Sequence, residues 1–402
     1  MAIVHTLTPV EHDPSPPRND TSSAMTRVLH VINGEHYAGA ERVQDHLAAR
    51  LPEFGYDVSF ACLKSGCFAA MRECRSAVVH ELFMRSKLDL RSAFRLASLV
   101  QQQKYAIVHT HGPRTAMIGS LAASLARVPL VHHVHTQTHR EIGNRLSRRL
   151  SAWVERRSLR RAACLISVSP TISRYLRGHG YADQKISLVP NGVPARSLPV
   201  EKTRREEWVI GLVALFRPRK GIETVLEALA DLRRQGLPVR LRAVGNFESL
   251  DYQQQVQRLS ARLDLENCVD WVGFRSEVDR ELQQMDVFVL PSLLSEGMPM
   301  SVLEAMAVGT PVVASRVDGV TDVIRDGEDG LLIQPGDVVE LSRALRMLFE
   351  GEANTTRLRR IAHERQTTLF SDRSMAAGVS AVYEEVLLQY RCGSGRHTQE
   401  LA

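Results

Sequence analysis

The most informative stretch of the chain runs from residue 290 to residue 315 and reads LPSLLSEGMPMSVLEAMAVGTPVVAS. It opens as an apolar strand, passes through a polar loop, continues with the pattern of a buried helix and closes in a second apolar run. Pro299 suits the start of that helix and Gly309 its end. The stretch therefore predicts a strand, loop, helix, turn and strand in succession, which is the repeating unit of an α/β protein with a mainly parallel sheet.

The same alternation extends through most of the chain. From residue 27 onward, short apolar runs rich in β-branched residues are followed by longer amphipathic segments. In the first half the predicted strands are 27–32, 57–62, 77–80, 106–109, 130–134, 164–168 and 186–189. In the second half they are 208–214, 240–244, 269–272, 287–290, 311–314 and 330–333. Residues 190–207 separate the two sets and are rich in Pro, Ser and charge, as in an interdomain linker.

The length of 402 residues also exceeds what one core usually supports. We expect two doubly wound α/β domains of similar size, the first over residues 26–195 and the second over residues 196–390. The last helix is predicted near 374–389, with room to pack back on the first domain. Residues 1–25 are expected to form a disordered leader and residues 391–402 a mobile tail. Ligands of such sheets bind at the carboxyl ends of the strands, so function should lie in a cleft between the domains.

Composition and charge exclude several classes of protein. Hydrophobic residues make up 44% and charged residues 24%, as in an ordinary globular protein. Uncharged runs such as 115–126 and 305–315 are shorter than the roughly 18 residues that a membrane-spanning helix needs. The start of the chain lacks the pattern of a secretory signal, so we expect a cytoplasmic protein. The net charge is +6, and the segment from Arg140 to Arg161, with eight Arg and two Glu, equals that excess, which is unlike a general nucleic-acid binder.

The six cysteines do not predict a disulfide framework, since they are sparse and include no CxxC pair. Cys62, Cys67, Cys74 and His80 could be drawn as a zinc set. Their spacings of four, six and five intervening residues fit no common structural zinc pattern. We therefore expect neither a metal nor another cofactor.

The quoted stretch also predicts chemistry. A helix that begins at the mouth of a parallel sheet presents unpaired N–H groups and the positive end of its dipole, which suits a phosphate or diphosphate. Gly297 would let such an anion approach the backbone. Glu304, within the helix, could accept hydrogen bonds from ribose hydroxyls beyond the diphosphate, and Glu296, in the loop, could do so for a sugar on the other side.

With its two glutamates eight positions apart, this stretch closely resembles the retaining nucleotide-sugar glycosyltransferases of the GT-B fold, in particular glycosyltransferase family 4. The resemblance covers residues 27 to about 390. It implies two Rossmann-like domains around a cleft, and transfer of a sugar from a nucleoside diphosphate to a hydroxyl with retention of the anomeric configuration. It also implies that Gly297, Met298, Pro299 and Glu304 contact the donor and that Glu296 orients the sugar.

Further residues follow from the resemblance. In VALFRPRKGIETVLEAL, residues 213–229, Lys220 before a glycine matches the family's diphosphate-binding lysine. The family's arginine would fall near Leu215, and we predict that Arg217 substitutes for it, with Arg219 beside it. Such cations would neutralise the departing diphosphate without a metal ion.

Histidines and a glycine loop complete the predicted site in the first domain. His135, at the end of a strand, matches the family's active-site histidine that hydrogen-bonds the transferred sugar. His109 and His111, at another strand end, are expected to line the acceptor pocket. Gly39 lies in a loop that matches the family's phosphate loop, where this chain has Ala38 in place of a glycine. VPNGV, at 189–193, lies at the domain junction, and Gly245 and Gly273 are expected at the wall for the base.

The family resemblance also implies a glycan or lipid-linked acceptor from envelope or extracellular polysaccharide synthesis. The Arg140–Arg161 segment carries apolar residues near helical spacing and could attach the protein peripherally to an anionic membrane on its cytoplasmic face. The alternative is a solvated helix that packs one face on its own domain.

Three other functions remain open on the residues. Glu296 and Glu304 could be the carboxyl pair of a glycosidase. The fold could serve a nucleotide-sugar epimerase. Leu215 and Ala38, which depart from the family pattern, would suit a non-catalytic nucleotide-sugar-binding partner of a polysaccharide machine.

Overall fold

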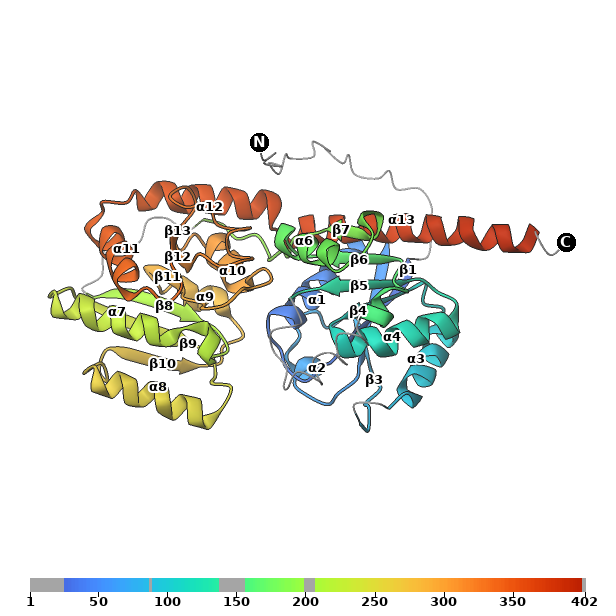
Figure 1. Ribbon diagram of the computed structural model, residues 1–402, viewed down its shortest axis with the longest axis horizontal. Coiled ribbons are helices and arrows are strands. Elements are labelled where there is room, and N and C mark those ends of the chain that lie inside the picture. The colour runs from blue at the N-terminus through green and yellow to red at the C-terminus, as the bar shows by residue number, and fades with distance from the viewer. Residues whose placement is uncertain (1–24, 87–88, 137–155, 199–206, 400–402) are drawn as a thin grey trace.

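The computed structural model describes residues 25–86, 89–136, 156–198 and 207–399 (Figure 1). Two parallel sheets dominate these residues, and their strand orders are β3-β2-β1-β4-β5-β6-β7 and β10-β9-β8-β11-β12-β13. The first sheet contains β1 Thr26–Ile32, β2 Tyr56–Cys62, β3 Val78–Glu81, β4 Ile107–His111, β5 Leu130–Val134, β6 Cys164–Ser167 and β7 Ile186–Leu188. The second contains β8 Trp208–Val213, β9 Val239–Val244, β10 Val269–Gly273, β11 Val287–Leu290, β12 Val312–Ser315 and β13 Leu331–Ile333.

Helices connect the strands and cover the sheets (Figure 1). Those of the first half are α1 Gly39–Arg50, η1 Leu51–Phe54, α2 Phe68–Met71, α3 Arg91–Gln102, α4 Pro113–Ala126, α6 Pro170–Gly178 and η3 Asp183–Lys185. Those of the second half are η4 Pro218–Lys220, α7 Ile222–Arg234, α8 Leu250–Arg262, α9 Val278–Leu282, α10 Met300–Ala307, α11 Val338–Glu350, α12 Thr355–Leu369 and α13 Asp372–Gln399.

Every strand predicted from the sequence is present, and its ends lie within two residues of the prediction. Strands buried on both faces need continuous apolar runs, and this is why such runs located them well. Several helix starts are also fixed by local chemistry. The side chains of Ser169, Ser249, Asp337 and Asn354 accept hydrogen bonds from the first turns of α6, α8, α11 and α12. The two-sheet α/β architecture expected from the sequence is confirmed.

The chain passes between the two halves at two points that lie together. Val193, which follows the first sheet, forms a bridge with Ser371, just before α13. The Val193 N–H donates to the Phe370 carbonyl at 3.0 Å, and the Asp372 N–H donates to the Val193 carbonyl at 3.0 Å. The predicted linker, 190–207, starts at this junction, while its residues 199–206 lie outside the described part of the chain.

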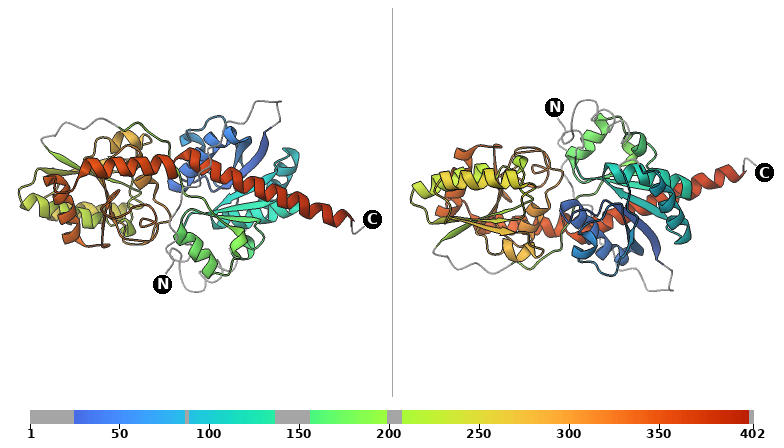
Figure 2. Two further views of the ribbon diagram at one scale, coloured as in Figure 1. Left: turned by 90° about the horizontal axis from the view of Figure 1, so that it is seen from above. Right: turned by 90° about the horizontal axis from the view of Figure 1, so that it is seen from below.

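The long helix α13 returns to the first half of the molecule. Figure 2 shows the red helix α13 running along the half of the molecule that contains the first sheet, which is coloured blue to green. It packs against α1, η1 and β6, and Arg50 donates to Asp372 at its start at 2.7 Å. We expected a mobile tail to begin at residue 391. The helix α13 instead extends to Gln399, so residues 391–399 are helical. Within the described residues, no helix is both long and apolar enough to cross a membrane.

Candidate active site

A cleft of about 540 Å³ lies where the carboxyl ends of the two sheets face each other. Strand-end loops of both halves line it, as parallel sheets require. Nine of the residues that the sequence placed in the site are among its lining: Gly39, His135, Arg217, Lys220, Glu296, Gly297, Met298, Pro299 and Glu304. The cleft is also lined by Leu215, Arg219, Asn191 and Gly245.

Lys220 and Glu296 form the electrostatic centre of the second-domain wall. The Lys220 Nζ lies 2.6 Å from Glu296 Oε1, and the Ser292 hydroxyl donates to the same oxygen at 2.6 Å. Burial by itself would raise the pKa of Glu296, but the Lys220 ammonium and these hydrogen bonds outweigh it and hold that pKa below its usual range. Glu296 is therefore ionised at neutral pH, and it holds Lys220 at the cleft.

Gly221 brings the basic loop close to the sheet. Its φ of +65° belongs to the left-handed region, and a Cβ at this position would lie 2.2 Å from the Pro291 carbonyl oxygen. Only glycine fits both conditions. The loop before it presents Arg217, Arg219 and Lys220 to the cleft, with Arg217 at 3.3 Å from Glu248. Leu215 stands where the family pattern has an arginine. Both Leu215 and Arg217 line the cleft, so Arg217 contacts the same cleft as the residue that it would replace in function.

Gly297 is a point of contact between the two domains. A Cβ built on it would lie 1.6 Å from the main-chain oxygen of His135. We expected this glycine to admit an anion, and the structure gives it another task, which is to let the β5 end of the first domain reach the second. Met298, the next residue, accepts hydrogen bonds from Asn191 at its sulfur, 3.1 Å, and at its carbonyl, 3.2 Å. The loop is thus pinned from the junction side as well.

We expect Gly297→Ala to separate the two walls of the cleft, because the new methyl group cannot share space with a backbone oxygen. Overpacking of this kind costs about 1 to 3 kcal/mol. Donor affinity, measured by calorimetry, should fall at least about tenfold. Gly327→Ala serves as the control for a lost glycine, because a Cβ there meets no atom within 4 Å, although its φ of +74° strains any substitution. If Gly297→Ala bound the donor as tightly as the unmodified protein, the close contact of Gly297 with His135 would not be what holds the two walls of the cleft together.

Glu304 forms an ion pair across the cleft. Its Oε1 lies 2.6 Å from Nη1 of Arg42, which comes from α1 of the first domain, and both side chains are largely buried. Burial raises the pKa of the Glu304 carboxyl, and Arg42 opposes that rise. The carboxylate that we expected to hold a ribose is therefore also the partner of a first-domain cation.

His135 reaches the cleft from the end of β5. Its Nε2 lies 3.1 Å from Nδ1 of His111, and burial lowers its pKa to about 4. The ring is therefore neutral at pH 7, and it can donate or accept a hydrogen bond but carries no charge.

Comparison with known proteins agrees with this geometry. The model of the family described as Glycosyltransferase Family 4 matches residues 37–196, and the model described as Glycosyl transferases group 1 matches residues 196–365. The chain belongs to glycosyltransferase family 4. It is a glycosyltransferase with the GT-B fold, as the sequence predicted.

Among the relatives of this family 4 enzyme is the UDP-Gal:alpha-D-GlcNAc-diphosphoundecaprenol alpha-1,3-galactosyltransferase of Escherichia coli. It is 29% identical over 347 residues, which are 81% of this chain and 88% of that one. The phosphatidyl-myo-inositol mannosyltransferase of Mycobacterium tuberculosis is 28% identical and covers 73% of this chain and 76% of its own. Anabaena HepE, solved in complex with UDP-glucose, superposes with a TM-score of 0.78 at 21% identity, over 89% of this chain and 99% of that one.

Our expectation for two histidines of the family 4 chain needs correction, and the zinc set that we considered and did not favour can be compared with the structure. His109 and His111 do not line the cleft, because both are buried beneath it, in contact with other histidines of the first sheet. The zinc set drawn on three cysteines is not assembled in the described residues. The groups there that could hold a metal ion consist of histidines instead, which are His30, His109 and His111, and His111, His133 and His135.

The basic segment between Arg140 and Arg161 lies mostly outside the described residues, since 137–155 are not described. Its described end has an exposed basic face, formed by Arg156, Arg157, Arg160 and Arg161, while Leu159 is buried in the first-domain core. This end therefore packs one face on its own domain.

Sequence reasoning missed Arg42 and Ser292. Arg42 follows directly after the glycine loop that we did single out, and an arginine at this place was the available signal for a cleft residue. Ser292 lies four residues before Glu296 in the quoted stretch, but its spacing carries no special pattern. Both are recognised only when the fold brings their partners close.

Proposed function

We propose that this glycosyltransferase moves a sugar from a nucleoside-diphosphate donor to an acceptor hydroxyl with retention of the anomeric configuration. The observation that carries this is the composition of one cleft, with three basic side chains and the start of α10 on one wall and His135 with the α1 loop on the other. Cations and helix N–H groups suit a diphosphate, and carboxylates suit the hydroxyls on either side of it.

In this proposal Lys220 and Arg217 hold the diphosphate. In the structure, Lys220 is paired with Glu296, and Arg217 lies near Glu248. A bound diphosphate would take over part of both cations, because it brings more negative charge than either carboxylate. Glu296 would then be free to accept hydrogen bonds from the sugar while Ser292 keeps it in place. Glu304 would accept from the ribose, and Gly39 and the Gly297–Pro299 loop would frame the donor.

The reaction would proceed on one face of the sugar. The bond between the anomeric carbon and the diphosphate oxygen breaks, and a bond from the acceptor oxygen to that carbon forms on the same side. The acceptor proton passes to the departing phosphate oxygen, and the nucleoside diphosphate leaves. The side chains of Lys220 and Arg217 would stabilise the charge that develops on it.

The test is transfer itself. We expect a screen of UDP-, GDP- and ADP-sugars to raise the melting temperature with one of the bases, since ligand that binds the native state stabilises it. That donor should then give a glycoside with an acceptor and slow hydrolysis without one. Donor binding with no transfer and no hydrolysis would favour a non-catalytic partner, and epimerised donor would favour an epimerase. Release of sugar from a simple glycoside without nucleotide would favour a hydrolase.

Glu304→Ala should weaken donor binding about 5- to 150-fold, because the ribose hydrogen bonds are worth about 1 to 3 kcal/mol. The change also leaves Arg42 without its carboxylate, so unfolding has to be followed alongside calorimetry. Glu364→Ala is the control, since it removes an exposed carboxylate of α12 from an arginine pair. Unchanged nucleotide affinity in Glu304→Ala would contradict the ribose role.

For the acceptor we propose a glycan or a lipid-linked sugar, used at the cytoplasmic face of a membrane. The names of the E. coli and M. tuberculosis relatives, which specify a diphosphoundecaprenol and a phosphatidylinositol, support this class. The exposed arginines at positions 156, 157, 160 and 161 support attachment to an anionic surface. We expect sedimentation with anionic but not neutral liposomes, reversed by high salt. Equal amounts of the protein in the supernatants of anionic and neutral liposomes would contradict attachment to an anionic membrane.

A further inference from the structure

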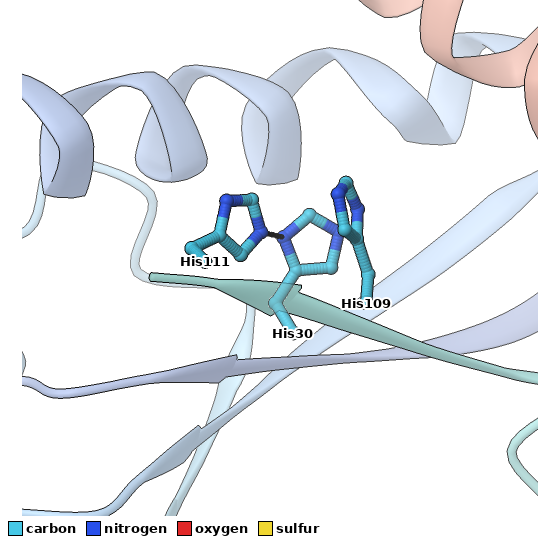
Figure 3. Close-up of side chains that lie close together, drawn as sticks. All are labelled: His30, His109 and His111. Atoms are coloured by element: carbon cyan, nitrogen blue, oxygen red, sulfur yellow. Dashed lines mark hydrogen bonds between the residues drawn. The ribbon is translucent and has the colours of Figure 1, made fainter. Parts of the chain in front are cut away.

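A row of hydrogen-bonded rings runs beneath the cleft from α13 to His135. The Tyr383 hydroxyl, on α13, lies 2.6 Å from His109 Nδ1 and 2.9 Å from His30 Nε2. His30 Nδ1 lies 3.2 Å from His111 Nε2, and His111 Nδ1 lies 3.1 Å from His135 Nε2. Figure 3 shows His30 between His111 and His109, with the hydrogen bond to His111. The row links strands β1, β4 and β5 at their carboxyl ends to the C-terminal helix.

The rings of the row are neutral. Burial lowers the pKa of His30 to about 3 and of His135 to about 4, and it lowers the pKa values of His109 and His111 well below 6.5. A neutral imidazole has one N–H and one lone pair. A ring in the middle of the row must therefore accept on one side and donate on the other, and all members point the same way provided that the Tyr383 O–H hydrogen is also used within the row.

Two directions satisfy every hydrogen bond in the row, and they differ at its ends. The end atoms are His109 Nε2 and His135 Nδ1, and neither has a hydrogen-bond partner among the described residues. If the row donates away from the cleft, His109 carries an N–H that is orphaned in the core. If it donates toward the cleft, His109 leaves a bare lone pair in the core, and the spare N–H is that of His135 Nδ1, which is also buried but belongs to a residue that lines the cleft. A buried N–H group rarely stays without an acceptor, and only at His135 does the cleft offer a place where a bound ligand could supply one, so the second direction is favoured.

We propose that Tyr383, His30 and His111 are positioning residues that hold His135 with its proton on Nδ1, so that this N–H is the donor to a hydroxyl of the bound sugar. The inference deepens the proposed function and rests on it for the role of His135. In the row, His109 Nδ1–H donates to the Tyr383 oxygen, Tyr383 donates to His30, His30 Nδ1–H to His111, and His111 Nδ1–H to His135 Nε2. Free histidine favours the other nitrogen, and the row fixes the less common form.

The same rings could be drawn as a metal site, since nitrogens of His30, His109 and His111 lie within 4.8 Å of one another. Hydrogen bonds already use the facing nitrogens of His30 and His111, as they do those of His111 and His135. We therefore favour the hydrogen-bonded row.

The experiment is two-bond 1H–15N correlation spectroscopy of the full chain labelled with 15N-histidine, which reports the protonated nitrogen of each ring. His135 is assigned from the spectrum of His135→Ala. We expect protonated Nδ1 at His30, His109, His111 and His135 in the unmodified protein, and a change at His135 toward protonated Nε2 in Tyr383→Phe. Tyr56→Phe is the matched control, because its ring lies 5.1 Å from that of Tyr383 and its hydroxyl is outside the row.

Transfer kinetics provide the second readout. Tyr383→Phe should lower kcat about tenfold, the effect of one lost positioning hydrogen bond, with little change in KM. The double variant Tyr383→Phe/His135→Ala should be no slower than His135→Ala, because Tyr383 acts through His135. Independent multiplication of the two effects would overturn the proposal, as would protonated Nε2 at His135 in the unmodified protein or a stoichiometric metal in the purified protein. Normal transfer by His135→Ala would refute the proposed role of His135, while the spectra would still test the row.

Discussion

Lys220→Ala should reduce kcat by about 100- to 1000-fold, the range seen when one group that stabilises a developing anion is removed. Lys220 is the cation that Glu296 holds at the cleft, at 2.6 Å, and in the proposed reaction it faces the diphosphate as the bond to the sugar breaks. The substitution has a second effect on Glu296. With its ammonium partner gone, the effect of burial is opposed less, so the pKa of that carboxyl moves upward.

Transfer rates at saturating donor measure the first effect, and the acid limb of the pH profile measures the second. That limb should move to higher pH in Lys220→Ala. The control is Arg360→Ala, which breaks an arginine–glutamate pair of the same 2.6 Å length on the exposed surface of α12. Exposed pairs contribute about 0 to 1 kcal/mol, so this variant should transfer at the normal rate. A Lys220→Ala enzyme with a near-normal rate would place the diphosphate elsewhere.

Stability should fall steeply when the pH is lowered from about 6.5 to 4. His30 and His132 have pKa values of about 3 and His135 of about 4, because burial penalises their charged forms. In this range the unfolded chain binds protons, with pKa values near 6.5, and the folded protein does not, so acid favours unfolding. The stability that these rings contribute is fully present above pH 6.5 and is lost as the pH falls toward their folded pKa values.

A single ring shifted from 6.5 to about 4 accounts for about 3 kcal/mol over this range. A typical protein has about 5 to 15 kcal/mol in total, so several such rings can unfold it. Urea unfolding at pH 7.5 and pH 5.0 measures the loss. His133→Phe should lose less on acidification, since His133 is also buried and neither of its ring nitrogens has a hydrogen-bond partner among the described residues. Equal unfolding midpoints at the two pH values would show that the cluster does not set acid stability.

The sequence predicts the sheets well and the contacts across the cleft poorly, for a physical reason. A strand that is buried on both faces, such as Val287–Leu290, consists of apolar residues only, so its own sequence indicates that it lies in the interior. The ion pair of Arg42 with Glu304 depends instead on how two domains meet, and neither residue's neighbours in sequence indicate the other. Gly297 is a mixed case, because the sequence shows that a glycine is needed there but not that a carbonyl of the other domain is the reason.

The histidines show the same limit. The strand pattern placed His135 at a loop and His109 and His111 at a neighbouring strand end, and both placements are right. The direction of the last two was wrong, because both side chains turn into the core, where His109 contacts Tyr383 of the last helix and His111 contacts His30. The sequence of a strand does not indicate that a helix from the far end of the chain packs on it.

The pairing of Val193 with Ser371 has a consequence for motion. Since both connections between the lobes are hydrogen-bonded side by side, the lobes share one narrow hinge, and opening of the enzyme should be a swing about it rather than a slide or a twist. In topological terms the second lobe is an insertion between the seven-stranded sheet and the helix α13 that covers this sheet. A fragment that ends before Asp372 would leave the first lobe uncovered, whereas the inserted lobe could be cut out at the hinge in one piece.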